Sequence, residues 1–166
     1  MKQEGFRTYS LAKGGFSVEV PSDWTVIESR SEDVPGAQFL APPPEGKRAV
    51  RHYISVDFFP RGNKVYSSPA EYEDYVASHD CPSAETARKA APLDVGGVQA
   101  RELRWCKPLP QSPEYAPEGR LAMRTVLLET GGGFYAINDA GPEDEGGAYA
   151  GVFRRVLETF KAGKPS

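Results

Sequence analysis

The sequence predicts an α+β fold, in which helices cover a single antiparallel sheet. Many short segments alternate apolar and polar residues with period 2, which is typical of strands with one buried face. Glycine-rich turns join neighbouring segments as hairpins, and hairpins connect antiparallel strands. Two further segments have apolar residues at helical spacing, and such helices need an apolar sheet face to cover. The length of 166 residues indicates one domain over residues 1–166, with an ordered core at about 6–161.

Four strands are expected in the first part of the chain. Residues 16–20 alternate with period 2, and extended structure resumes at residues 24–27 after a proline. Residues 37–41 form a further short strand before a run of three prolines. Residues 51–59 form the clearest strand. One face of this strand carries His52, Ile54, Val56 and Phe58, and the opposite face carries Arg51, Tyr53, Ser55, Asp57 and Phe59.

A capping box after this strand marks the start of a helix. Pro69 occupies the first helical position, and the Ser68 hydroxyl can accept a hydrogen bond from the Glu71 amide. The Glu71 carboxylate can in turn accept one from the Ser68 amide. These signals predict a helix over residues 69–79. Its apolar face is formed by Tyr72, Tyr75, Val76 and His79.

Glycines predict two hairpins in the second half of the chain. The Gly-Gly pair at 96–97 tolerates the positive φ of a tight turn and leads into a strand over residues 98–106. The three glycines at 131–133 join a strongly apolar strand at 121–129 to another at 134–139. Both hairpins extend the expected antiparallel sheet.

The last predicted element is a second helix, preceded by a long loop. Residues 108–117 contain four prolines and cannot supply a central strand, so we expect a loop there. Gly163 suits a C-terminal helix cap, since glycine readily adopts the left-handed conformation of that position. The apolar stripe of the helix is formed by Tyr149, Val152, Phe153, Val156 and Phe160.

Composition narrows the classes of partner. Nucleic-acid binding needs a basic surface, whereas this chain has a net charge of −3 and a pI near 5.5. No apolar run approaches the roughly 18 residues of a membrane span, and the start of the chain has no apolar segment typical of a signal peptide. The sequence does not fix the cellular location, and an extracytoplasmic location is slightly favoured over a cytoplasmic one.

The two cysteines, Cys81 and Cys106, allow either one disulfide or two separate thiols. A free cysteine often serves as a small buried apolar residue. An oxidising compartment would favour the bond instead. The sequence leaves both alternatives open, as it does the oligomeric state.

Five motifs occur in the order found in one known family. Residues 15–24, GFSVEVPSDW, resemble the opening motif of PsbP-like proteins, and residues 68–72, SPAEY, resemble the start of that family's middle helix. Residues 95–101, VGGVQAR, resemble its hairpin. Residues 134–137, FYAI, and 153–160, FRRVLETF, resemble its aromatic strand and closing helix. The proline-rich loops do not belong to this pattern.

This resemblance implies an α/β/α sandwich, with a central antiparallel sheet flanked by helices. PsbP-like proteins include extrinsic subunits of photosystem II, a nuclear Ran-binding protein, bacterial lipoproteins and chaperone-like proteins of secretion systems. Most are binding proteins without a shared catalytic arrangement. The resemblance therefore implies a noncatalytic binding or accessory domain that engages a protein partner or a small ligand. A structural subunit or chaperone of an envelope or secretion complex is an alternative.

No coherent catalytic, cofactor-binding or metal-binding set is predicted. Ser10 and Lys13 match the S-x-x-K pattern, but two glycines follow at once where that chemistry needs a helix. The alternative of an enzyme depends on His52, His79 and Asp80, which could form a hydrolytic or metal site only if they converge in space.

One candidate partner surface follows from the residue types that anchor interfaces. Arg101 and Trp105 share a face of their strand, and Tyr115 lies in the proline-rich loop. Tryptophan, tyrosine and arginine are enriched at binding hot spots. We therefore expect Arg101, Trp105 and Tyr115 to contact a partner, with core packing of Trp105 as the alternative.

Overall fold

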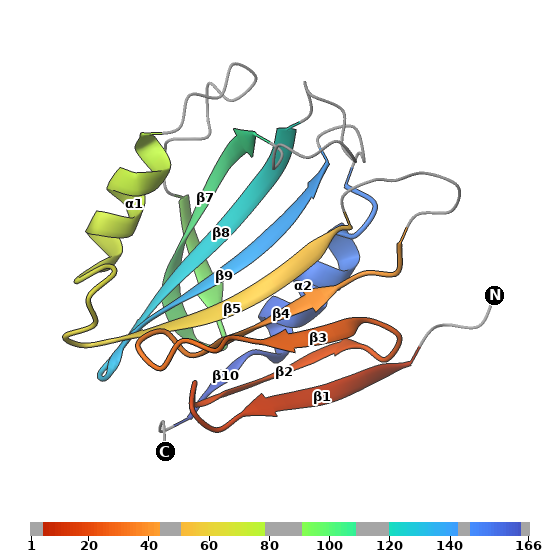
Figure 1. The fold of residues 1–166 in the computed structure, drawn as a ribbon, viewed down its shortest axis with the longest axis horizontal. Coiled ribbons are helices and arrows are strands. Elements are labelled where there is room, and N and C mark those ends of the chain that lie inside the picture. Colours follow the sequence, from red (N-terminus) through yellow and green to blue (C-terminus); the bar gives the residue numbers. More distant parts are fainter. Residues whose placement is uncertain (1–4, 44–50, 79–90, 109–119, 143–146, 164–166) are drawn as a thin grey trace.

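The computed structural model describes residues 5–43, 51–78, 91–108, 120–142 and 147–163. These residues form two antiparallel sheets and two helices (Figure 1). In chain order the elements are β1 (Phe6–Leu11), β2 (Phe16–Pro21), β3 (Thr25–Glu28), β4 (Gly36–Leu40), β5 (Tyr53–Pro60), α1 (Pro69–Ala77), β6 (Ala91–Val95), β7 (Val98–Pro108), β8 (Arg120–Thr130), β9 (Gly133–Pro142), α2 (Ala150–Thr159) and β10 (Lys161–Ala162).

The larger sheet has the strand order β3-β4-β5-β9-β8-β7-β6, and every neighbouring pair is antiparallel. β9 lies at its centre between β5 and β8 (Figure 1). The β5–β9 pairing joins distant parts of the chain, with Ser55 opposite Asn138 and Asp57 opposite Ala136. The α+β class and the antiparallel pairing predicted from the sequence are confirmed, whereas the single sheet is not, because β2 pairs with β1 and β10 in a second sheet.

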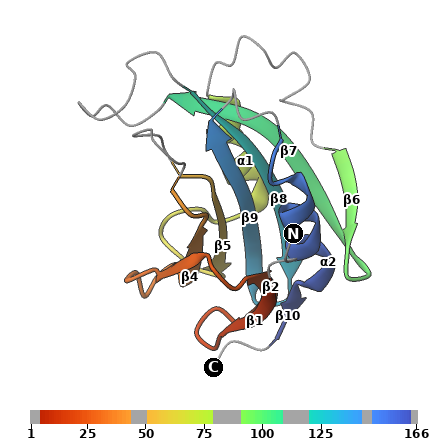
Figure 2. The ribbon, with the colours of Figure 1, turned by 90° about the vertical axis from the view of Figure 1, so that its right-hand side faces the viewer.

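Each face of this sheet is covered by one helix, as an α/β/α arrangement requires. α2 lies behind the sheet in Figure 1, and Figure 2 shows α2 on the near side of the strands and α1 behind them. Phe153 and Val156 of α2 belong to a core with Ile54, Val56 and Ile137 of the sheet. The core on the other face contains two residues of α1, Tyr72 and Val76, together with Phe59, Leu103, Trp105, Leu121, Met123, Leu127, Phe134, Ala136 and Ala140.

The smaller sheet, in the order β1-β2-β10, extends the core on the α2 face. β1 was not predicted, because residues 6–11 lack a clear apolar alternation and most of their side chains are exposed. The Tyr135 hydroxyl links the two sheets by donating to the carbonyl oxygens of Gly14 and Gly15, at 2.6 and 2.9 Å.

α1 begins at the predicted capping box, with one difference in the hydrogen bonding. The Ser68 side chain accepts from the Glu71 amide at 3.3 Å, as expected. The Glu71 carboxylate, however, accepts from the amide of Ser67 at 2.8 Å rather than from that of Ser68. The expectation for the second bond was therefore wrong by one residue.

Both predicted hairpins are present. Gly96 and Gly97 have φ angles of 59° and 84°, in the left-handed region that glycine tolerates, and they join β6 to β7. The glycine triplet at 131–133 joins β8 to β9. A Cβ at Gly133, where φ is 149°, would lie 2.9 Å from the Cα of Pro60, so only glycine fits there.

The expected cap at Gly163 is wrong. α2 ends at Thr159, and the next residue, Phe160, has φ and ψ of −60° and 128°, which are extended rather than helical. The chain then continues into β10, which pairs with β2. Gly163 donates its amide to the carbonyl oxygen of Gly15 instead of closing the helix.

Candidate functional site

A hollow of about 560 Å³ lies on the α1 face of the larger sheet. Small-molecule sites typically have volumes of about 300–1,000 Å³. β9 contributes Asn138 to its lining, and the neighbouring residues of β9 on this face are Ala136 and Ala140.

Aromatic side chains form one wall of the hollow. The ring centres of Tyr66 and Tyr72 are 5.0 Å apart, and each lies within 6.2 Å of Tyr75. Tyr75 in turn lies 5.9 Å from Trp105, and Phe59 lies 5.5 Å from Tyr66. All five rings line the hollow. The capping box fixes the residue at which α1 begins. The start of α1 in turn determines which of its side chains, Tyr72 and Tyr75 among them, face the hollow.

Hydrogen-bonded polar side chains form the floor. The Trp105 indole donates to Thr125 at 2.8 Å, and Thr125 donates to the Asn138 carbonyl at 2.5 Å. The Asn138 amide donates to Ser55 at 3.3 Å, and the Tyr72 hydroxyl also reaches Asn138, at 3.4 Å. The chain of bonds crosses β7, β8, β9 and β5, and it satisfies buried polar groups that would otherwise be costly.

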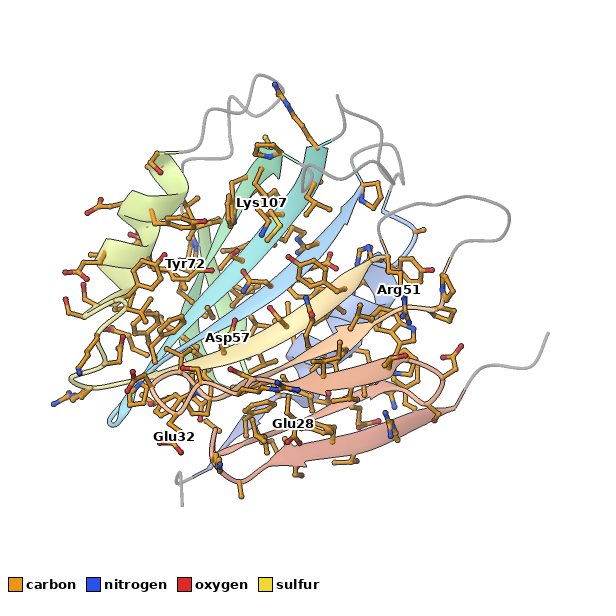
Figure 3. The ribbon with its side chains drawn as sticks, viewed as in Figure 1. Glu28, Glu32, Arg51, Asp57, Tyr72 and Lys107 are labelled. Carbon is orange, nitrogen blue, oxygen red and sulfur yellow. The ribbon has the colours of Figure 1, made fainter. Side chains whose placement is uncertain are left out.

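Asp57 is the charged group of the hollow floor, and its carboxylate has no hydrogen-bond or ion-pair partner within the described part of the chain. Burial raises the pKa of Asp57 to about 6. Burial and the nearby charge of Asp57 also raise the pKa of Tyr72. Figure 3 shows Asp57 over the middle of β5, with Tyr72 of α1 on the same side of the sheet.

Gly36 makes room for this carboxylate. Gly36 lies directly opposite Asp57 in the β4–β5 ladder. A Cβ at position 36 would collide with the Asp57 carboxylate and would lie 2.7 Å from the carbonyl oxygen of Val56. The absence of a side chain at Gly36 therefore lets the Asp57 carboxylate lie against β4.

Basic side chains lie away from Asp57. Arg51 donates to the carbonyl oxygens of Ala41 and Leu40 at the far end of β5. Lys107 lines the hollow near the end of β7, and Figure 3 shows both basic residues apart from Asp57. Glu28 also lines the hollow, so its edge carries a second carboxylate.

The structure describes two of the three residues predicted to contact a partner, and they lie in different surroundings. Trp105 is buried, with 6% of its surface exposed, and it packs in the α1-side core and lines the hollow. Arg101 is exposed and forms a 3.1 Å ion pair with Glu73 of α1. Tyr115 lies outside the described residues. Partner contact by this set stays a prediction.

The histidine of the alternative enzyme hypothesis lies on the other face of the sheet. His52 is buried and pairs with Asp139, which has 9% of its surface exposed. Its ring lies 4.6 Å from that of Tyr149 and 6.2 Å from that of Trp24. The other two residues of that hypothesis, His79 and Asp80, lie outside the described residues.

The structure also bears on the S-x-x-K motif, on metal ligation and on the two cysteines. Ser10 lies on β1 and Lys13 in the turn that follows, so this S-x-x-K segment does not begin a helix. No group of three or more metal-ligating side chains occurs among the residues that the structure describes. Cys106 is engaged in a disulfide bond, whereas Cys81, the other cysteine of the chain, lies outside the described residues.

The polar residues of the hollow were not singled out from the sequence. The alternation of residues 51–59 placed Ser55 and Asp57 on one face with Tyr53 and Phe59. Two polar residues on a face that also carries aromatic ones were the available signal. The same pattern is typical of a solvent-exposed strand face, so it did not distinguish a site.

Comparisons with known proteins establish the fold. No family model and no curated protein matches the sequence. Among solved structures, cyanobacterial PsbP from Synechocystis sp. PCC 6803 has a TM-score of 0.56 at 12% identity, covering 96% of this chain and 93% of that one. LpqN of Mycobacterium tuberculosis, described as involved in cell envelope biogenesis, has a TM-score of 0.54 at 14% identity, with 96% and 91% covered.

A third structure, from Bacteroides thetaiotaomicron VPI-5482, has a TM-score of 0.57 at 18% identity. It matches 98% of this chain, which spans half the length of the Bacteroides chain. Identities this low concern the fold alone. The resemblance to PsbP-like proteins predicted from the sequence motifs is thus confirmed for the fold.

Proposed function

We propose that this chain of PsbP-like fold is a noncatalytic binding domain, and that the hollow on the α1 face is its binding site. The observation that carries the proposal is the convergence of an aromatic wall, a hydrogen-bonded floor and an unpaired carboxylate around 560 Å³ of open space. Apolar walls with a few placed polar groups are the usual composition of a ligand site.

The chemistry of the hollow supports binding over catalysis. Its floor side chains Asn138 and Ser55 are hydrogen-bonded to one another, and buried Thr125 donates to Asn138, so these groups are suited to orienting a ligand. The buried pair of His52 and Asp139 lies on the opposite face, where it cannot act on a ligand in the hollow. Among the described lining residues, Asp57 is the candidate acid or base, and no hydrogen bond within the described residues joins it to a hydroxyl that it could activate.

A small ligand suits the hollow better than a large protein surface does, because its volume matches that of a single small molecule. Contact with a protein partner through Arg101, Trp105 and Tyr115 is a second proposal. It is supported by the exposure of Arg101 beside α1, where 59% of its side chain is accessible.

We also propose an extracytoplasmic location. No helix in the described ranges is long and apolar enough to span a membrane. The disulfide at Cys106 supports an oxidising compartment, because cytosolic thiols are normally kept reduced. The involvement of the similarly folded LpqN in cell envelope biogenesis agrees with this location.

Binding of the neutral fluorescent dye Nile red tests the proposed site. We expect the native protein to bind the dye and the Gln38→Trp variant to lose it, because half-buried Gln38 lines the hollow and a large ring there would fill it. Thr8→Trp, an exposed change on β1, is the matched control and should bind as the wild type does. Equal dye binding by Gln38→Trp, or none by the wild type, would contradict the proposal.

A further inference from the structure

The hollow contains a carboxylate that the described residues leave without a counter-ion. Asp57 is largely buried, and its pKa is raised by burial rather than lowered by a neighbouring cation. Removing a charged carboxylate from water is costly unless the charge is paired. An external cation in the hollow would supply the missing partner.

The basic residues of this face have other positions or partners. Arg101 shares a row of the sheet with Asp57, through Ala136 and Leu127, but lies three strands away and pairs with Glu73. Three strand spacings correspond to about 14 Å. Lys107 lies six residues further along β7 from Arg101, which increases its separation from Asp57. A cationic ligand beside Asp57 would therefore not be repelled by Arg101 or Lys107.

Aromatic rings lie close to the unpaired carboxylate. Phe59 is two residues from Asp57 on the same face of β5, and its ring centre lies 5.9 Å from that of Tyr72 and 5.5 Å from that of Tyr66. Tyr72 and Asp57 both line the hollow, and Figure 3 shows them on the same side of the sheet. Ring faces attract cations, and cages of aromatic rings bind quaternary ammonium ligands. A carboxylate adds a charged acceptor for the N–H groups of an ammonium ion.

From this geometry we propose that the hollow binds an organic ammonium ion, with the charged group at Asp57 and the apolar body against the aromatic wall. This inference rests on the proposed binding function and names its ligand class. The second carboxylate at the edge of the hollow, Glu28, adds negative potential that attracts cations.

Other ligand classes fit less well. A metal ion needs several oxygen ligands at once, whereas the described residues contain no such group. A neutral ligand such as a sugar would leave Asp57 desolvated without a counter-charge. An anionic ligand would be repelled by both Asp57 and Glu28.

Competition with bound Nile red distinguishes these possibilities. Benzylammonium and benzyl alcohol have the same ring and nearly the same size, and they differ in charge. At neutral pH we expect benzylammonium to displace the dye from the wild type at a concentration about tenfold lower than benzyl alcohol requires. In Asp57→Asn and Asp57→Ala the ratio should fall to about one, since the charge partner is gone.

Asp23→Asn is the matched control, because it removes an exposed carboxylate that does not line the hollow. We expect this variant to keep most of the preference for benzylammonium. Equal competition by the two compounds in the wild type would overturn the ammonium proposal while leaving the hollow as a binding site. Retention of the preference in both Asp57 variants would also overturn it. Failure of the wild type to bind Nile red at all would contradict the proposed function itself.

Discussion

Gly36 and Asp57 face each other across the β4–β5 ladder, and the missing side chain of Gly36 is what lets the Asp57 carboxylate lie against β4. Gly36→Ala would place a methyl group 2.7 Å from the carbonyl oxygen of Val56, so the strand or the carboxylate must move. We expect this change to lower the free energy of unfolding by about 1–3 kcal/mol, as overpacking does. Urea denaturation measures the loss.

The same variant should weaken the preference of the hollow for benzylammonium, because Asp57 is displaced. Gly131→Ala is the control, since a Cβ at position 131 meets nothing within 4 Å. It should leave both stability and ligand preference close to those of the wild type. A Gly36→Ala protein with unchanged stability would show that the strand absorbs the methyl group without cost.

The raised pKa of Asp57 predicts the pH dependence of stability. The pKa is about 6 in the folded protein against an ordinary value of 3.8, so the folded state binds more protons between these values. The contribution of Asp57 therefore favours folding at low pH and is lost as the pH rises through 6. We expect Asp57→Asn to be more stable than the wild type at neutral pH, by up to about 3 kcal/mol.

Urea denaturation at several pH values checks this prediction. The difference between Asp57→Asn and the wild type should shrink as the pH falls from neutral toward 4. The other titratable residues that line the hollow are the same in both proteins, so the comparison isolates Asp57; they are Glu28, Tyr53, Tyr66, Tyr72, Tyr75 and Lys107. Asp23→Asn removes an exposed carboxylate and should not reproduce the effect. A variant less stable than the wild type at neutral pH would contradict the prediction.

Thr125 is the central link of the hollow floor and has no exposed surface. Its hydroxyl accepts from Trp105 and donates to Asn138. Thr125→Val keeps the shape but removes the hydroxyl, so buried polar atoms lose a partner at a cost of about 1–3 kcal/mol. Thr125→Ser keeps the hydroxyl and loses a methyl group, which costs about 1 kcal/mol. Thermal or urea unfolding should therefore rank valine as the more damaging change, and the reverse order would contradict the role of the hydroxyl.

The parts of the fold that depend on local pattern could be predicted from the sequence. The alternation of residues 51–59 identified both faces of β5, because side chains in a strand point alternately to either side. The capping box identified the start of α1, and the glycine pair at 96–97 identified a hairpin. Each of these signals comes from residues that are close together in the sequence, so it can be recognised without knowing the fold.

The hollow could not be predicted, because it depends on contacts between distant residues. Ser55 and Asn138 are 83 positions apart in the chain and meet only when β5 pairs with β9. The space beside Asp57 depends on Gly36 in another strand. β10 was missed for a related reason, since its two residues form a strand only by pairing with β2.

Mass spectrometry can detect the disulfide at Cys106. The chain has one other cysteine, Cys81, so we expect the purified protein to be lighter than its reduced form by the mass of two hydrogen atoms. Reduction should lower the free energy of unfolding by about 3–4 kcal/mol, because the closed loop restricts the unfolded chain. The double variant Cys81→Ser with Cys106→Ser should unfold identically with and without reductant. Two alkylatable thiols in the native protein, with no change of stability on reduction, would contradict the bond and remove its support for an extracytoplasmic location.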